Sequence, residues 1–129
     1  MSRPVHFEIH SADPDRAAAF YTALFGWQIK KWEGPMEYWM IVTGGDPEPG
    51  INGGLVRRRG AAPAEGQPVN AFVCTVGVDD LDATLAKLPT AGGTVALAKM
   101  PIPGVGQLAY VKDPDGNLLG ILQPERDAE

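Results

Sequence analysis

The chain has 129 residues, of which 44% are hydrophobic and 21% are charged, a composition typical of a globular protein and unlike that of a disordered chain. Its formal net charge is −5, which argues against nucleic-acid binding because such proteins carry basic faces. No run approaches the roughly 18 apolar residues of a membrane span, and the first residues lack an apolar signal core. The single cysteine, Cys74, cannot form an internal disulfide, so we expect a cytoplasmic protein without a membrane partner.

The first half of the chain predicts a strand, a helix and three further strands. Asp13 is a good N-cap, Pro14 suits the first helical position, and Gly26 suits a left-handed stop. Apolar residues at helical spacing predict the buried face of this helix: Ala17, Phe20, Tyr21, Leu24 and Phe25. Runs typical of strands follow at 27–32, 38–43 and 55–58.

The second half repeats this order. A strand around residues 72–78 leads to Asp79 as the expected helix cap, and the helix presents a narrow stripe of Leu81, Leu85 and Leu88. Pro89 is expected to end the helix at or before Leu88, with Gly92 beyond it. Strands are expected over 94–98, 108–112 and 118–123.

An internal repeat explains this parallel. Asp13 to Gly26 and Asp79 to Gly92 have the same spacing. We therefore expect an α+β fold of two tandem βαβββ modules, 4–58 and 70–123, joined by a Pro- and Gly-containing linker over 60–68. Because neither half buries enough surface alone, residues 1–129 are predicted to form a single domain.

The sequence resembles the vicinal oxygen chelate superfamily, which includes glyoxalase I, bleomycin-resistance proteins and extradiol dioxygenases. The resemblance spans about residues 4–123 and is carried by Val5-His6-Phe7-Glu8-Ile9, Asp13-Pro14, Phe20-Tyr21, Leu24-Phe25-Gly26-Trp27, Gly53-Gly54, Val78-Asp79-Asp80, Gly92-Gly93 and Asp113-Pro114-Asp115-Gly116-Asn117. It implies glyoxalase-like modules that curl a mixed sheet around a cavity, and it implies a homodimer.

Family enzymes hold a divalent metal with His and Glu ligands from four strands. Carried over position by position, the resemblance places His6 at the first ligand position, Val73 on the fifth strand and Gly120 on the last strand. The fourth-strand position falls within 53–56, which contains no His, Glu or Asp. We therefore expect a degenerate site with no metal or other cofactor, and a divalent metal is the less favoured alternative.

Alternation on the first strand predicts that His6, Glu8 and His10 share one face, with Phe7 and Ile9 on the helix-packed face. His6 and Glu8 are the candidates for general acid–base catalysis, and all three are candidates for ligand binding. The alternative interpretation is that Glu8 and His10 pair with each other or with nearby backbone.

Five further residues are predicted to contact a ligand: Trp39, Val73, Thr75, Tyr110 and Gly120. Trp39 and Tyr110 would stack against a flat ligand, although packing in the core or in a dimer is the commoner role of such residues. Alternation along the predicted strand around residues 72–78 likewise places Phe72, Cys74 and Val76 on the face that packs against the second helix.

Three functions remain open at this point. The favoured hypothesis is binding of a small organic molecule in an apolar cavity, without the metal and with catalysis undecided. The second is a metal-dependent lyase or dioxygenase of the same superfamily that uses His6. The third is a non-catalytic interaction module whose cavity is filled by side chains.

Overall fold

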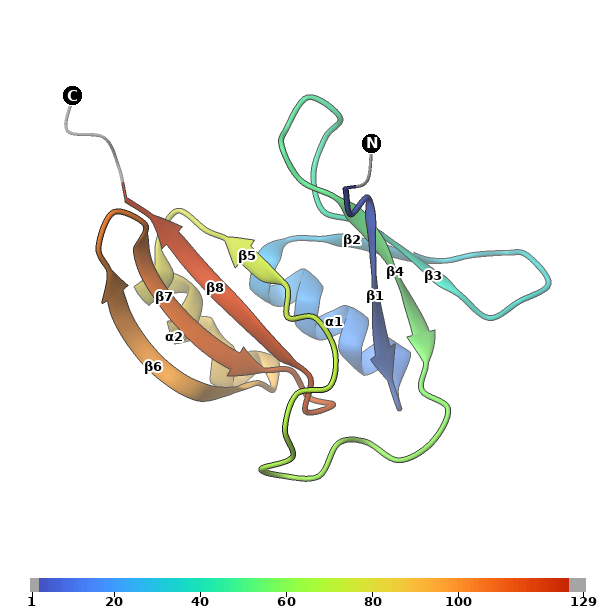
Figure 1. Cartoon of the computed structure of the whole chain (residues 1–129). Helices are drawn as coiled ribbons and strands as arrows, with labels where there is room; N and C mark the ends of the chain where they lie inside the picture. Colours follow the sequence, from blue (N-terminus) through green and yellow to red (C-terminus); the bar gives the residue numbers. More distant parts are fainter. Residues whose placement is uncertain (1–2, 126–129) are drawn as a thin grey trace. The chain divides into compact units, whose positions relative to one another are not determined.

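The computed structural model describes residues 3–125 and divides the chain into two compact units, Met1–Ala62 and Pro63–Glu129 (Figure 1). The boundary falls within the predicted linker 60–68, and residues 58–74 form neither helix nor strand. Unit 1 contains β1 (His6–Ser11), α1 (Pro14–Phe25), β2 (Gln28–Lys31), β3 (Trp39–Val42) and β4 (Asn52–Arg57). Unit 2 contains β5 (Thr75–Gly77), α2 (Leu81–Ala91), β6 (Thr94–Ile102), β7 (Gly106–Lys112) and β8 (Leu118–Pro124).

Each unit holds one four-stranded mixed sheet, and the strand order is equivalent in the two. Sheet A has the order β1-β4-β3-β2 and sheet B the order β5-β8-β7-β6. The first strand of each sheet runs parallel to the last, and the remaining pairs are antiparallel. This arrangement confirms the predicted α+β class and the tandem βαβββ order.

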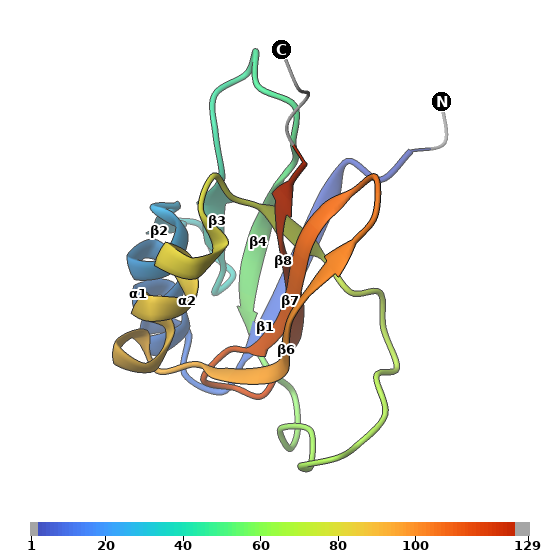
Figure 2. The same cartoon turned by 90° about the vertical axis from the view of Figure 1, so that its left-hand side faces the viewer.

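Helix α1 begins and ends where the sequence predicts. The Asp13 side chain accepts a hydrogen bond from the Arg16 N–H at 3.2 Å, and Gly26 closes the helix with a φ of 76°. The helix lies along one face of sheet A (Figure 2). Its predicted apolar face is buried at Ala17, Phe20, Tyr21 and Leu24, while Phe25 is half-buried.

Helix α2 corrects two predictions. Asp80, and not Asp79, is its N-cap and accepts from the Ala83 N–H at 3.1 Å, so this helix is one residue shorter than α1. Pro89 does not end the helix, which continues to Ala91. Pro89 lies in the last turn, where a lost N–H and a crowded carbonyl disturb few helical hydrogen bonds, and the helix ends at Gly92, whose N–H donates to the Leu88 carbonyl at 3.1 Å. Within residues 3–125, neither helix has the length and apolar character needed to cross a membrane.

The core of unit 2 lies between α2 and sheet B. Its buried apolar residues are Leu81, Leu88, Ala109, Val111, Leu119 and Ile121. The β7–β8 turn is organised by Asp113, which is 4% exposed. Strand β6 forms one edge of sheet B, is mostly exposed, and shifts its register against β7 at two places.

The predicted burial of Phe72 and Cys74 against the helix is wrong. Phe72 is fully exposed and Cys74 is exposed. The physical reason is the short first strand of sheet B: β5 begins only at Thr75, so both residues precede the alternation that would have aimed them at α2. Val76, within the strand, is half-buried.

Candidate functional site

Strand β1 aims its polar side chains away from α1. His6, Glu8 and His10 are exposed, while Phe7 and Ile9 are half-buried on the helix-packed face, as the alternation predicts. We call the side of each sheet opposite its helix the open face. The same parity holds at the start of β3, where Tyr38, just before the strand, and Met40 share the open side and Trp39 between them is buried.

His6 is joined to a tyrosine from the neighbouring part of sheet A. The Tyr38 hydroxyl lies 3.2 Å from His6 Nε2, a hydrogen bond whose donor depends on the histidine tautomer. To reach His6 the tyrosine crosses Gly54 of β4, where an added Cβ would collide with the phenol oxygen. Glycine at this position therefore creates the space in which the tyrosine lies.

Glu8 and His10 form a separate pair. Glu8 Oε1 lies 2.8 Å from His10 Nε2, and both side chains are about half exposed, at 49% and 48%. This is the pairing that the alternative interpretation anticipated. The structure therefore divides the three polar residues of β1 between two hydrogen-bonded pairs.

An ion pair that the sequence analysis missed lies beside Tyr38. Arg57 Nε and Nη2 donate to the two carboxylate oxygens of Glu37 at 2.8 and 3.1 Å. The hydrogen bond from Arg57 holds the pKa of Glu37 below its ordinary value, with a smaller contribution from the charge of Lys31, and the same bond raises the pKa of Arg57. Because the Glu37 pKa is lowered, the ion pair contributes its full stabilisation of the folded state above the ordinary carboxyl pKa. This stabilisation is lost as the pH falls through the lowered pKa of Glu37.

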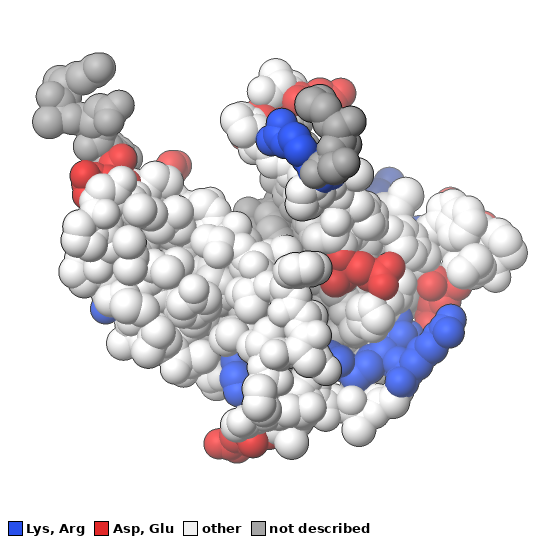
Figure 3. Space-filling model, in the orientation of Figure 1, with Lys and Arg blue, Asp and Glu red and all other residues white. Residues whose placement is uncertain are grey.

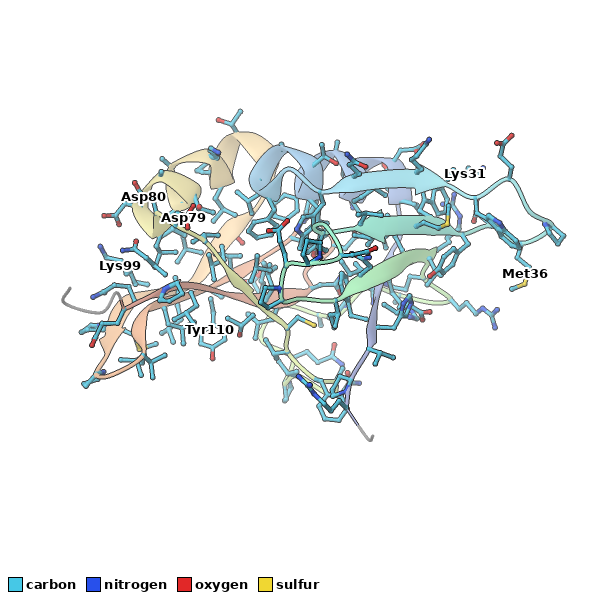
Figure 4. The ribbon with its side chains drawn as sticks, turned by 90° about the horizontal axis from the view of Figure 1, so that it is seen from above. Lys31, Met36, Asp79, Asp80, Lys99 and Tyr110 are labelled. Carbon is cyan, nitrogen blue, oxygen red and sulfur yellow. The ribbon has the colours of Figure 1, made fainter. Side chains whose placement is uncertain are left out.

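Sheet B brings together three of the predicted ligand-binding positions. Thr75 and Tyr110 flank Gly120 in register, one on each side. A Cβ added to Gly120 would lie 2.8 Å from Thr75 Oγ1 and 3.3 Å from Tyr110 Cε1, so these side chains converge over the glycine. Figure 4 shows Tyr110 pointing to the side of the sheet opposite α2. Val73 precedes β5, is 37% exposed and lies outside this row.

The open face of sheet B is largely apolar. Figure 3 shows few charged side chains on the front of unit 2, whereas acidic and basic groups lie on the front of unit 1. Leu97 pairs in register with Tyr110 and so continues the row of Thr75, Gly120 and Tyr110 across the sheet. The next row on the same face consists of Leu122, Leu108 and Met100. The two open faces therefore differ in character, with the polar one on sheet A.

Trp39 does not belong to the open face. It is 5% exposed, its register partner Leu55 is fully buried, and Lys31 Nζ lies 5.3 Å from the centre of its ring. Its burial follows from strand parity, because Trp39 and Ile41 alternate with the exposed Met40 and Val42. Trp39 is a core residue of unit 1, on the side of sheet A opposite to Tyr38.

The family's metal-ligand positions, as the resemblance places them, hold few donor side chains. The first of these positions is His6, and the other three fall on Val73, Gly120 and residues 53–56. Within residues 3–125, no three His, Cys, Asp or Glu side chains are grouped so that they could hold a metal ion.

Comparison with known proteins identifies relatives along almost the whole chain. The chain is 35% identical over 118 residues to "Putative glyoxylase CFP32" of Mycobacterium tuberculosis, covering 91% of this chain but 42% of that protein. It is 30% identical over 125 residues to "Probable lactoylglutathione lyase" of Vibrio cholerae, covering 94% of this chain and 90% of that protein. The chain thus spans less than half of the mycobacterial relative.

A solved structure shows the same fold. TnmS3, described as an antibiotic binding protein from a Streptomyces species, superposes with a TM-score of 0.67 at 24% identity, covering 97% of this chain and 98% of TnmS3. The model of the glyoxalase/bleomycin resistance protein/dioxygenase superfamily matches residues 3–121. With the strand order of both units and this match over nearly the full length, the chain belongs to the glyoxalase/bleomycin resistance protein/dioxygenase superfamily, as the resemblance implied.

Proposed function

We propose that this chain binds a small, largely apolar organic molecule that carries a hydroxyl or similar hydrogen-bonding group, without using a metal. The observation that carries the proposal is the Tyr38–His6 pair over Gly54, because it provides exposed hydrogen-bonding groups at the first position of the family's site. Met40, which is 45% exposed and pairs in register with Gly54, supplies apolar surface on the same open side of sheet A, of the kind that weakly polar ligands prefer. TnmS3, which shares the fold, is described as binding an antibiotic.

The residues present do not fit a divalent metal at the family's positions. A metal site needs three or four converging N, O or S donors, and Val73 and Gly120 offer no donor side chain. His6 Nε2 is hydrogen-bonded to Tyr38, and the Glu8 carboxylate is hydrogen-bonded to His10. Without anionic ligands directed at one point, little would offset the cost of dehydrating the ion.

Each polar pair has a distinct role in this proposal. The imidazole of His6 and the hydroxyl of Tyr38 can each donate a hydrogen bond to a ligand hydroxyl or accept one from it. Either group could also exchange a proton with that hydroxyl. Glu8, held by His10, is the candidate for accepting a proton from a ligand. Thr75 and Tyr110, which converge over Gly120 on the open face of sheet B, are separate candidates for contact with an apolar molecule.

The test is a fluorescence titration with 2-naphthol and with naphthalene, which lacks only the hydroxyl. We expect saturable binding of both, with 2-naphthol about fivefold tighter, the preference that one hydrogen bond provides. Tyr38→Phe should remove most of this preference and leave naphthalene binding unchanged. Tyr21→Phe, the same chemical change at a buried residue of α1, is the matched control. No saturable binding of either compound would contradict the proposal and favour the interaction-module hypothesis.

A metal titration separates the proposal from the lyase or dioxygenase alternative, which the similarity to the Vibrio cholerae protein keeps open. Nickel, zinc, iron(II) and manganese are each added to dialysed protein. We expect no stoichiometric binding. One tightly bound equivalent that is lost in His6→Ala would instead favour the metal-dependent enzyme.

We propose a homodimer as the working assembly and the cytoplasm as its location. The single cysteine, Cys74, suits a reducing compartment. Each small sheet leaves exposed apolar side chains, such as Val42 in unit 1 and Leu97 in unit 2, that a partner would cover. Sedimentation at micromolar concentration should give about twice the chain mass of 13.7 kDa, and a species of 13.7 kDa would contradict the dimer.

A further inference from the structure

We infer that Arg57 and Glu37 are positioning residues, which hold Tyr38 over Gly54 and through it fix the imidazole of His6. We call this ion pair the Arg57–Glu37 clamp. The inference deepens the proposed function, on which its role in ligand recognition rests, but the positioning of His6 is a property of the free protein and is tested separately.

The clamp is anchored at the end of an inner strand of sheet A. Arg57 is the last residue of β4, a strand that pairs with both β1 and β3. Its guanidinium meets both oxygens of Glu37, and Nη1 also donates to the Ala12 carbonyl at 3.3 Å. A planar guanidinium that uses three nitrogens on two segments has one preferred orientation, which a lysine would not reproduce.

The clamp acts on Tyr38 through the adjoining backbone. Glu37 immediately precedes Tyr38, in the loop between β2 and β3, so fixing the Glu37 carboxylate restricts the backbone from which the tyrosine projects. On the other side, the Trp32 N–H donates to the Tyr38 carbonyl at 2.7 Å. The end of the loop is therefore fixed by two contacts, the Glu37 carboxylate with Arg57 and the Tyr38 carbonyl with the Trp32 N–H. Both contacts form although the side chains of the loop are substantially exposed.

Held in this way, Tyr38 orients His6. The ring of Tyr38 spans Gly54, and its hydroxyl meets His6 Nε2 at 3.2 Å. When the phenol donates to Nε2, the neutral imidazole carries its proton on Nδ1. The clamp thereby acts on the hydrogen-bonding state of His6 without touching a ligand.

The decisive measurement is the side-chain ¹H–¹⁵N spectrum of His6 in the ligand-free protein. The chain has two histidines, and His10→Gln assigns their signals. We expect Arg57→Met to shift the His6 signals toward those of Tyr38→Phe, and Arg57→Lys to restore them only in part. Glu37→Gln provides a second variant should Arg57→Met fail to fold, and the same shift of the His6 signals is expected.

The matched control is Lys99→Met, which breaks the Lys99–Asp82 ion pair of unit 2 and should leave the His6 signals unchanged. Wild-type His6 signals in a folded clamp variant would overturn the inference.

The naphthol titration gives the second readout. We expect Arg57→Met to reduce the roughly fivefold preference for 2-naphthol to below about twofold, with unchanged affinity for naphthalene. Equal loss of affinity for both compounds would indicate general damage and count against positioning. If the wild-type protein binds neither compound, the proposed function fails, while the His6 spectra still decide whether the clamp positions the imidazole.

Discussion

Phe20→Ala is expected to lower the free energy of unfolding by about 3–5 kcal/mol, the range for removing a buried aromatic ring. Phe20 is 1% exposed and packs edge-on against Tyr21, with ring centroids 4.9 Å apart. The substitution removes apolar contact and leaves a cavity between α1 and sheet A that neighbouring side chains fill only partly. Urea unfolding followed by circular dichroism measures the change.

The same substitution at Phe72 is the matched control. Phe72 is fully exposed in the structure, so Phe72→Ala should change stability by no more than about 0.5 kcal/mol. A loss at Phe72 as large as that at Phe20 would show that the segment before β5 is covered in solution. It would contradict the exposure described for that residue.

Asp113→Ala is expected to cost about 2–4 kcal/mol, because the carboxylate organises the turn between β7 and β8. Asp113 Oδ1 accepts from the N–H groups of Asp115 and Asn117, both at 2.9 Å, and Oδ2 accepts from Asn117 Nδ2 at 3.0 Å. Alanine removes these three acceptor interactions from a residue that is 4% exposed. Thermal unfolding should show a clearly lowered midpoint.

Asp113→Asn distinguishes the loss of acceptors from the loss of charge. The amide keeps one carbonyl oxygen that can accept from the Asp115 and Asn117 N–H groups, as side chains of this type do in turns. We therefore expect a smaller loss than for alanine. Equal losses for the two variants would mean that the backbone hydrogen bonds to Oδ1 contribute little.

Local signals determined how much of the fold could be predicted. Asp13 and Gly26 act within one turn of the chain, so their capping roles could be read from sequence and are confirmed. Two adjacent aspartates precede α2, and equal spacing favoured Asp79, whereas the structure uses Asp80. The choice between neighbouring caps depends on tertiary packing, which a spacing argument does not contain.

The candidate site shows the same division. Alternation on β1 placed His6 and Glu8 on the open side because parity is a local property. The contact between Tyr38 and His6 joins residues 32 positions apart, so it depends on the register of three strands. The signal that would have indicated it is Gly54, since a glycine on the open side of a central strand leaves space for a neighbouring ring. The predicted ligand contacts themselves stay predictions.

The irregular register of β6 bears on whether a further strand could add to the edge of sheet B. An exposed edge strand with apolar side chains, here Val95 and Leu97, is a template for strand addition and fibrous aggregation. The register shifts between Val95 and Leu97 and between Leu97 and Met100 interrupt the regular spacing of free backbone groups, and Pro101 removes one donor. An approaching strand would therefore meet only short regular stretches, which disfavours strand addition at the edge of sheet B while the apolar side chains are kept.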